Sequence, residues 1–180
     1  MAKILVLTGS PRVKGNSNRM AKAFIEAAEK AGHEVTRFDT ARMKINGCQG
    51  CMYCIEHGST CVQHDDFDQI RKPFEQADVL VYVTPIYYYS YTAQLKAALD
   101  RTFCFAGNPP AIDGKRVALL TCCEEKTPDT MDGARFMFER GAKISKQEVL
   151  GEICIPGVFE AGAIENTDAF KQIEELVAQI

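Results

Sequence analysis

The residues with the clearest chemical potential follow a short apolar run near the start of the chain. Ile4–Leu7 is unbroken and apolar, and the stretch Thr8–Asn18 that follows is rich in glycine, hydroxyl and amide residues. A helical pattern comes next, in which Met20, Phe24 and Ala28 recur every four residues. A buried strand, a polar loop and a helix start together predict a phosphate site, because the free N–H groups of the first turn and the helix dipole favour an anion.

This first loop is typical of a site for one terminal phosphate. It lacks the Gly-Lys-Ser/Thr ending of a nucleoside triphosphatase loop and the Gly-x-Gly-x-x-Gly of a dinucleotide fold. Its side-chain donors are mostly neutral, from Ser10, Ser17 and Asn18, and Arg12 can add a charge. We therefore expect a monophosphate that is held by hydrogen bonds without a metal. The alternative is an ordinary strand-to-helix turn capped by Asn16 or Ser17.

A second unusual loop follows a central apolar run. Four of the five residues in 87–91 are tyrosines, and they come directly after Pro85 and Ile86. A tyrosine ring offers a flat apolar face, and the backbone after Pro85 is expected to offer N–H groups beside it. A flavin ring needs both, since negative charge collects on its pyrimidine edge on reduction. The two loops together fit flavin mononucleotide (FMN), and a tyrosine-rich dimer contact is a compatible alternative.

A third feature is a cluster of cysteines in the segment between these loops. Its members are Cys48, Cys51, Cys54 and Cys61. This spacing allows four thiolates to converge on one [4Fe–4S] cluster, and Gly47 and Gly50 would let the backbone fold around it. The closing Cys-Pro of a ferredoxin run is missing, because Val62 follows Cys61. Free or redox-active thiols and a zinc site remain open as alternatives.

Composition places the chain among ordinary globular proteins. Its 180 residues and 46% hydrophobic content suit one domain with a single core. A net charge of −3 and the lack of a basic block argue against nucleic acid as a partner. The apolar runs are too short to cross a bilayer, and the first is too short for a signal peptide, so we expect no membrane partner and a cytoplasmic location. Because that compartment is reducing, we do not expect the eight cysteines to form structural disulfides.

Strands and helices are expected to alternate along the chain. Apolar or alternating runs predict strands at 4–7, 34–40, 78–84, 115–122 and 148–155. Helical spacing predicts helices at about 20–31, 65–76, 94–104, 130–141 and 170–180, and a connection at 105–114. We therefore predict a single α/β domain over residues 1–180, with a cysteine-rich insertion at about 44–64.

The predicted architecture is a flavodoxin-like three-layer sandwich, with a five-stranded parallel sheet in the order 2-1-3-4-5. In such sheets ligands lie beyond the carboxyl ends of the strands, at the point where the strand order reverses. The segments at those ends are 8–18, 85–91 and 121–125. We therefore expect three chemically unusual loops to meet at one place.

Two motifs resemble those of the NADPH-dependent FMN reductase family. The run Gly9-Ser10-Pro11-Arg12-x-x-Gly15-Asn16-Ser17-Asn18 is similar to its phosphate loop. The run Thr84-Pro85-Ile86-Tyr87-Tyr88-x-Ser90-x-Thr92-Ala93-Gln94-Leu95-Lys96-x-x-x-Asp100-Arg101 is similar to its second flavin-contacting segment. The cysteine spacing resembles the compact motif of the iron–sulfur flavoproteins, a branch of this family. The resemblance covers nearly the whole chain.

The resemblance implies a flavodoxin-like fold, bound FMN, and a homodimer or homotetramer with the flavin near a subunit interface. It assigns the phosphate to Ser10, Arg12, Asn16, Ser17 and Asn18. It assigns the ring to Pro85, Ile86, Tyr87 and Tyr88, and the third side of the site to Thr121 and Cys122. The third loop departs from the family, because Cys122-Cys123-Glu124 stands where glycine is common.

These observations favour an FMN-dependent oxidoreductase that passes reducing equivalents from NAD(P)H through FMN to a small-molecule or electron-carrier acceptor. No side chain is nominated as catalytic. One alternative is an iron–sulfur flavoprotein, in which a cluster on the four cysteines exchanges single electrons between a ferredoxin-like donor and the flavin. Another is a non-enzymatic module that stores flavin or senses redox state. A phosphatase of the Cys-x5-Arg type is disfavoured, because none of the eight cysteines has an arginine six residues later.

Overall fold

Alternating apolar side chains on a central strand set the layers of this fold. In β1 (Lys3–Thr8), Ile4 and Val6 belong to one buried cluster, whereas Leu5 and Leu7 belong to another. Successive side chains of a strand point to opposite faces of the sheet, so β1 needs cover on both sides. The sheet therefore has a hydrophobic core above it and a second one below.

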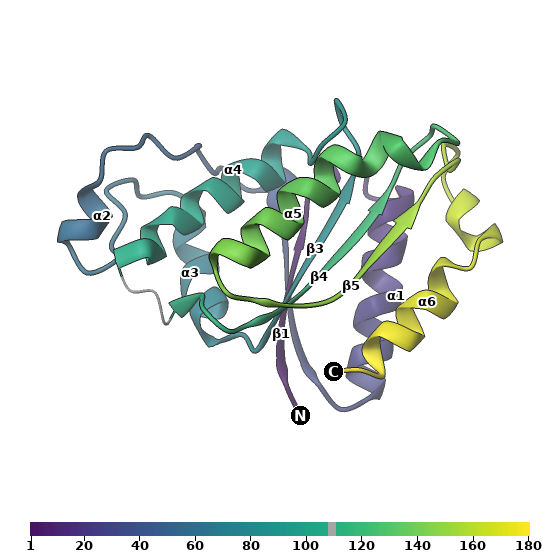
Figure 1. Cartoon of the computed structure of the whole chain (residues 1–180), viewed down its shortest axis with the longest axis horizontal. Helices are drawn as coiled ribbons and strands as arrows, with labels where there is room; N and C mark the ends of the chain where they lie inside the picture. Colours follow the sequence, from purple (N-terminus) through teal and green to yellow (C-terminus); the bar gives the residue numbers. More distant parts are fainter. Residues whose placement is uncertain (108–110) are drawn as a thin grey trace.

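The computed structural model describes residues 1–107 and 111–180, and it has one five-stranded parallel sheet in the order β2-β1-β3-β4-β5 (Figure 1). This confirms the predicted flavodoxin-like order. The strands that follow β1 along the chain are β2 (Glu34–Asp39), β3 (Val79–Pro85), β4 (Arg116–Cys122) and β5 (Glu148–Ile155).

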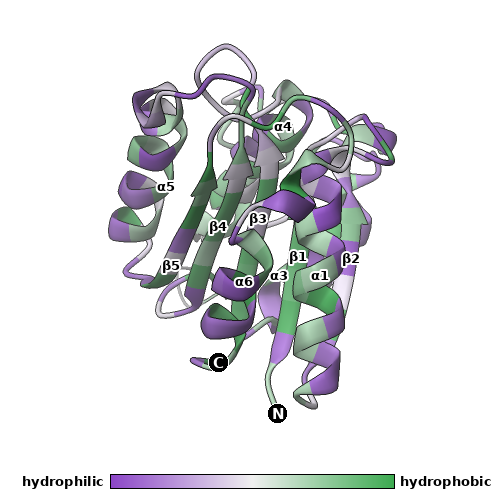
Figure 2. Cartoon of the chain, turned by 90° about the vertical axis from the view of Figure 1, so that its right-hand side faces the viewer, coloured by the Kyte–Doolittle hydropathy of each residue, from purple (hydrophilic) through white to green (hydrophobic). Residues whose placement is uncertain are grey.

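Helices cover both faces of the sheet. One face is covered by α1 (Asn16–Lys30) and α6 (Ala169–Val177), which stand in front of the strands in Figure 2. The other is covered by α3 (Phe67–Gln76), α4 (Ala93–Arg101) and α5 (Asp132–Ile144). In the described parts of the chain no helix is both long and apolar enough to cross a membrane.

The boundaries of some helices differ from the prediction for local reasons. The predicted helix 94–104 ends as α-helix at Arg101 and continues as the 3₁₀ segment η2 (Thr102–Gly107). The Thr102 hydroxyl donates to the Leu99 carbonyl at 2.7 Å, which favours this tighter turn. A further 3₁₀ segment, η4 (Pro128–Met131), replaces the start of the helix predicted from residue 130. Part of the predicted connection 105–114 lies outside the described residues.

The segment predicted as a cysteine-rich loop is accompanied by two short helical turns. The first, η1 (Thr40–Arg42), lies just before the predicted insertion at 44–64, and the second, the four-residue α2 (Tyr53–Glu56), lies within it. Figure 1 shows that this segment projects at the end of the molecule opposite to α6. The cysteine loop, Cys48–Cys61, is thus an addition at the rim of the sandwich, beside α3 and α4.

Two glycines of α5 allow a matched test of how this helix packs against the backbone of Tyr89. A Cβ at Gly133 would lie 2.3 Å from the Tyr89 carbonyl oxygen, whereas a Cβ at Gly141 would meet no described atom within 4 Å. We expect Gly133→Ala to lower the free energy of unfolding by about 1–3 kcal/mol through overpacking. Gly141→Ala should raise it by about 0.5–1 kcal/mol, because it removes backbone entropy from the unfolded chain. Urea denaturation of both variants measures this; effects of the same sign would contradict the packing.

Candidate functional site

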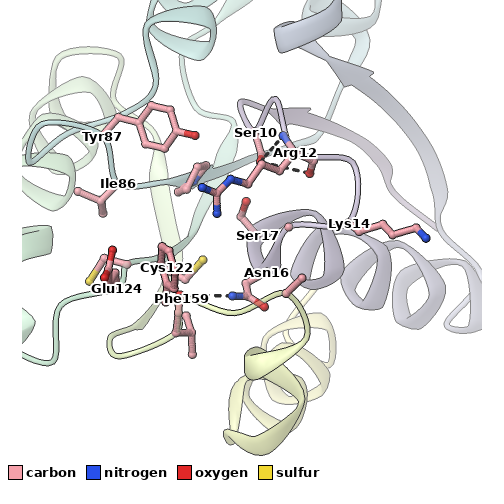
Figure 3. A pocket seen from close by; sticks show the side chains of 15 residues that line it. Ser10, Arg12, Lys14, Asn16, Ser17, Ile86, Tyr87, Cys122, Glu124 and Phe159 are labelled. Carbon is pink, nitrogen blue, oxygen red and sulfur yellow. Dashed lines mark hydrogen bonds between the residues drawn. The ribbon is translucent and has the colours of Figure 1, made fainter.

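A cavity of about 260 Å³ lies at the carboxyl ends of the strands, where the sheet order reverses around β1 and β3. The loops after β1, β3 and β4 line it, so the three loops predicted to converge do meet at one place. A fourth segment, 158–161, comes from beyond β5 and closes the remaining side. Figure 3 shows these side chains around the opening.

The N-terminus of α1 presents its positive end to this cavity. Gly15 occupies the N-cap position, and the Arg19 N–H makes the first helical hydrogen bond, to the Gly15 carbonyl at 3.1 Å. The N–H groups of residues 16–18 therefore precede the intrahelical ladder. Among the described residues of the first turn none is acidic, so the helix dipole is not offset there. The geometry suits an anion.

Ser17 adds a buried hydroxyl at the same end of the helix. The residue is 2% exposed, and its Oγ has no hydrogen-bond partner among the described residues. A buried polar atom without a partner costs about 1–3 kcal/mol. In Figure 3 this hydroxyl points toward the cavity, where a ligand oxygen would satisfy it.

The loop before α1 is held by its own side chains. Ser10 Oγ accepts from the Arg12 N–H at 3.2 Å, which closes a tight turn. Asn18 Nδ2 donates to the Arg12 carbonyl at 2.8 Å, and Asn18 Oδ1 accepts from Arg37 Nη2 at 3.0 Å. The Arg12 guanidinium carbon lies 5.8 Å from the centre of the Phe159 ring, across the mouth of the cavity. Arg12 is thus positioned to supply a positive charge.

Asn16 ties α1 to the fourth segment of the site. Its Nδ2 donates to the carbonyls of Val158 and Glu160 at 3.3 and 3.0 Å. Its Oδ1 accepts from the N–H groups of Gly162 and Ile164 at 3.0 and 3.4 Å. Both polar ends of this side chain are therefore engaged by the protein. Asn16 keeps its backbone N–H for a ligand and uses its side chain to build the wall.

The tyrosine segment forms a tight hairpin after β3. Tyr87 and Ser90 exchange backbone hydrogen bonds of 3.0 and 3.1 Å, and the two residues between them, Tyr88 and Tyr89, have φ values of 49° and 62°. The Ile86 N–H donates to the Cys122 carbonyl at 3.0 Å. The expectation of free N–H groups directly after Pro85 is therefore wrong for Ile86 and Tyr87, because the sheet edge and the turn use them.

The third loop contributes a neutral thiol. Cys122 is 3% exposed, and burial, reinforced by Cys123, raises its pKa to about 12, although the Ser17 N–H partly opposes the shift. At neutral pH the Cys122 side chain is therefore an uncharged wall of the cavity. Thr121 lies beneath it, with its Oγ1 donating to the Thr84 carbonyl at 2.8 Å.

Most of the predicted flavin-site residues come together in this cavity, and some do not. The predicted residues that line it are Ser10, Arg12, Asn16, Ser17, Pro85, Ile86, Tyr87 and Cys122. Those outside its lining are Asn18, Tyr88 and Thr121, of which Asn18 and Thr121 hold the loops in shape. Lining residues that were not nominated individually, although they lie in the segments predicted to meet, are Lys14, Cys123 and Glu124, whereas Val158, Phe159 and Ala161 were missed altogether. No spacing signal marks the segment 158–161.

The four clustered cysteines line a second, smaller cavity. Its volume is about 20 Å³, room for about one water molecule, and Arg101 and Cys104 also line it. Cys48 and Cys51 are exposed, Cys61 is half-buried and Cys54 is buried. Within residues 1–107 and 111–180 no three potential ligands already stand in a metal-binding arrangement. The donor chemistry fits a thiolate-bound metal cluster, and the loop would have to widen to hold one.

Cys104 is a fifth cysteine at this cavity, and the spacing of the other four gives no sign of it. It lies in η2, far along the chain from the other four, and is 2% exposed. Burial raises its pKa to about 12. Only the packing of η2 against the cysteine loop reveals that a fifth thiol faces the same cavity.

A cavity at a helix N-terminus, at the switch point of a flavodoxin-like sheet, is typical of nucleotide-binding α/β proteins. Residues 2–128 match the family model of the NADPH-dependent FMN reductases, and the chain belongs to this family. This agrees with the resemblance seen in the two sequence motifs.

Curated relatives include several iron–sulfur flavoproteins. One from Archaeoglobus fulgidus is 37% identical over 113 residues, which are 63% of this chain and 50% of that protein. One from Methanosarcina thermophila is 31% identical over 119 residues, 66% of this chain and 62% of that protein. The chain spans about half the length of the curated relatives it matches.

Solved structures share the fold. An FMN-dependent NADH-azoreductase from Bacillus anthracis, in complex with FMN, superposes with a TM-score of 0.74 at 13% identity and covers 99% of both chains. An NAD(P)H:quinone oxidoreductase from Methanothermobacter marburgensis gives 0.73 at 18% identity, covering 98% of this chain and 94% of that one. At these identities the similarity shows the fold alone.

The strained hairpin yields a prediction. Positive φ at both central positions suits Asn-Gly better than Tyr-Tyr, and Tyr88 is 98% exposed, so its replacement removes few contacts. We expect Tyr88→Asn combined with Tyr89→Gly to raise the free energy of unfolding by about 1–2 kcal/mol. Tyr88→Phe keeps the strain and should leave it unchanged. Thermal and urea unfolding check this; a less stable double variant would contradict it.

Proposed function

We propose that this protein is an FMN-dependent oxidoreductase whose flavin binds in the 260 Å³ cavity. The observation that supports this most directly is the Ser17 hydroxyl, buried and without a partner among the described residues, at a helix N-terminus that faces the cavity. Membership of the NADPH-dependent FMN reductase family supports the same assignment.

The residues present fit a terminal phosphate. The hydroxyls of Ser10 and Ser17 and the backbone N–H groups at the start of α1 would donate to its oxygens, and Arg12 would balance its charge. Asn18 and Asn16 would hold this cradle rigid through the contacts they already make. Such preorganisation lowers the entropy cost of binding.

The apolar walls fit a flat ring. Ile86 and Tyr87 lie on one side of the cavity in Figure 3, and the buried Cys122 and the half-exposed Phe159 also line it. When bound, FMN supplies hydride and single-electron chemistry that protein side chains lack. Tyr87 and Phe159 are both about half exposed, which leaves a path for a second reactant such as NAD(P)H or an acceptor to reach the ring. The chain's part is to hold, orient and partly shield the ring.

Loss of the Ser17 hydroxyl tests the site. We expect Ser17→Ala to weaken FMN binding about ten- to a hundredfold, because it removes a buried hydrogen bond to a charged group. Ser145→Ala, at the distant end of α5, is the matched control and should bind FMN like the wild type. Quenching of FMN fluorescence gives both dissociation constants.

The same preparation tests the reaction. Anaerobic addition of NADPH or NADH should bleach the two visible bands of the bound flavin. A wild-type protein that does not bind FMN would refute the proposed site. Binding without bleaching by NAD(P)H or by a reduced ferredoxin would favour the module that stores flavin or senses redox state.

A second function, electron transfer through an iron–sulfur cluster, is favoured by the gathering of Cys48, Cys51, Cys54 and Cys61 at one cavity. Relatives named iron–sulfur flavoproteins support it. These four thiols would bind the iron, and the cluster would supply one-electron transfer. Zinc and free thiols are the competing states of this cavity.

The homodimer or homotetramer implied by the family resemblance stays a prediction, which sedimentation velocity can check.

Metal analysis of anaerobically purified protein decides between these states. We expect about four iron and four sulfide per chain, with broad absorption beneath the flavin bands. Cys54→Ser should abolish both while FMN binding persists, because Cys54 is remote from the flavin cavity. Cys154→Ser, outside the cysteine cavity, is the control. Zinc in place of iron, or neither metal, would contradict the cluster.

A further inference from the structure

We propose that Arg101 is the positioning residue of the cysteine loop, by which we mean Cys48–Cys61. One buried guanidinium ties both ends of this loop and keeps its thiols gathered at one cavity. The purpose that we give to this arrangement rests on the proposed redox function of the loop. The arrangement itself rests only on contacts within this chain.

The side chain of Arg101 contacts the chain just before and just after the loop; these two flanking segments together are called the neck of the loop. The residue ends α4, and its side chain is fully buried. Its Nη1 donates to the Asn46 carbonyl at 3.1 Å, and its Nη2 donates to the Gln63 carbonyl at 3.2 Å. Asn46 lies two residues before Cys48, and Gln63 lies two residues after Cys61. A single planar group therefore fixes the entry and the exit of the loop.

Asp65 holds the guanidinium in place. Its Oδ2 accepts from Arg101 Nη1 at 2.6 Å and also from the Asn46 N–H at 3.0 Å, while its Oδ1 accepts from the Phe67 N–H at 3.1 Å. The guanidinium carbon lies 5.0 Å from the centre of the Phe67 ring. A buried cation needs such a partner, and the rigid fork of an arginine matches several acceptors at once, which a lysine cannot do.

Two side-chain contacts across the neck are exposed and therefore weaker, and a backbone hydrogen bond of 3.2 Å from the Asp66 N–H to the Lys44 carbonyl accompanies them. Gln63 Nε2 donates to the Gly47 carbonyl at 3.1 Å, and the Lys44 N–H donates to Asp66 Oδ2 at 2.7 Å, both in solvent-exposed surroundings. Water competes for these groups, but it does not compete for a fully buried guanidinium. The side chain of Arg101 is therefore the contact across the neck from which water is most completely excluded.

The same helix also links the cysteine cavity to the loop that follows β1. At its start, Thr92 caps α4 and donates from Oγ1 to the Gly9 carbonyl at 2.8 Å, beside the flavin loops. At its end, Arg101 lines the cysteine cavity. Nine helical residues span about 13 Å. Arg101 thus holds the cysteine loop at a fixed place relative to the flavin cavity, and its positive charge faces the thiols.

Residue-resolved alkylation tests the proposal. FMN-saturated protein, purified anaerobically, is treated with iodoacetamide, and mass spectrometry follows each cysteine over time. The variants are Arg101→Gln and Arg101→Lys, and the matched control is Lys96→Gln, which removes an exposed positive charge from the same helix. Iron is measured in every sample, so a protein without a cluster contradicts the proposed electron carrier and leaves this test intact.

We expect R101Q to speed alkylation of the inner thiols Cys54, Cys61 and Cys104 about tenfold or more, because the loop opens locally. Cys122 and Cys154, which lie outside the loop, should react within twofold of the wild-type rate, and K96Q should change none of them. Unchanged rates at the three inner thiols would overturn the proposal. An equal increase at all five would also overturn it, since that pattern indicates global unfolding.

The conservative variants separate the fork from the charge. R101K keeps the charge and loses the fork, so it should behave like R101Q; wild-type rates in R101K would overturn the clamp. If R101Q does not fold, Asp65→Asn decides the question. It keeps the shape of the side chain but weakens the hold on the guanidinium, so the same three thiols should react faster. Wild-type rates at all three in D65N would overturn the proposal.

Discussion

Burial of β1 on both faces is the constraint on which the rest of the structure depends. Ile4 and Val6 pack beneath α1 and α6, and Leu5 and Leu7 pack on the opposite layer. Because neither face of this interior strand is open to water, polar chemistry moves to the strand ends. There the parallel arrangement places the loops after neighbouring strands side by side, which creates the cavity at α1.

The polar residues of the proposed flavin cavity have two different roles. The side chains of Asn16 and Asn18 form hydrogen bonds with the protein itself, whereas the hydroxyl of Ser17 has no partner among the described residues. The two asparagines make the cradle rigid. The serine hydroxyl favours a ligand whose oxygen would accept its hydrogen bond. The left-handed backbone of Tyr88 and Tyr89 is a second local cost, which fits the tendency of strain to gather at functional sites.

How far the sequence could predict this site depends on the range of the contacts involved. The strands follow from apolar periodicity, and their order and the meeting of three loops follow from the rules for doubly wound parallel sheets. Segment 158–161 escaped prediction because it reaches the cavity through hydrogen bonds from Asn16, across most of the chain. The N–H groups after Pro85 were misassigned for a similar reason, since the Cys122 carbonyl that accepts one of them belongs to another strand.

By itself, the sequence determined the layer order, the phosphate-type loop and the spacing of four cysteines, because each is written in residues close together along the chain. Only the tertiary structure decided which groups share a cavity. It brought Cys104 to the other cysteines and placed Arg101 between Asn46 and Gln63, contacts that join three separate segments. The physical reason is that burial selects partners by the packing of helices on the sheet, and periodicity along one segment does not specify that packing.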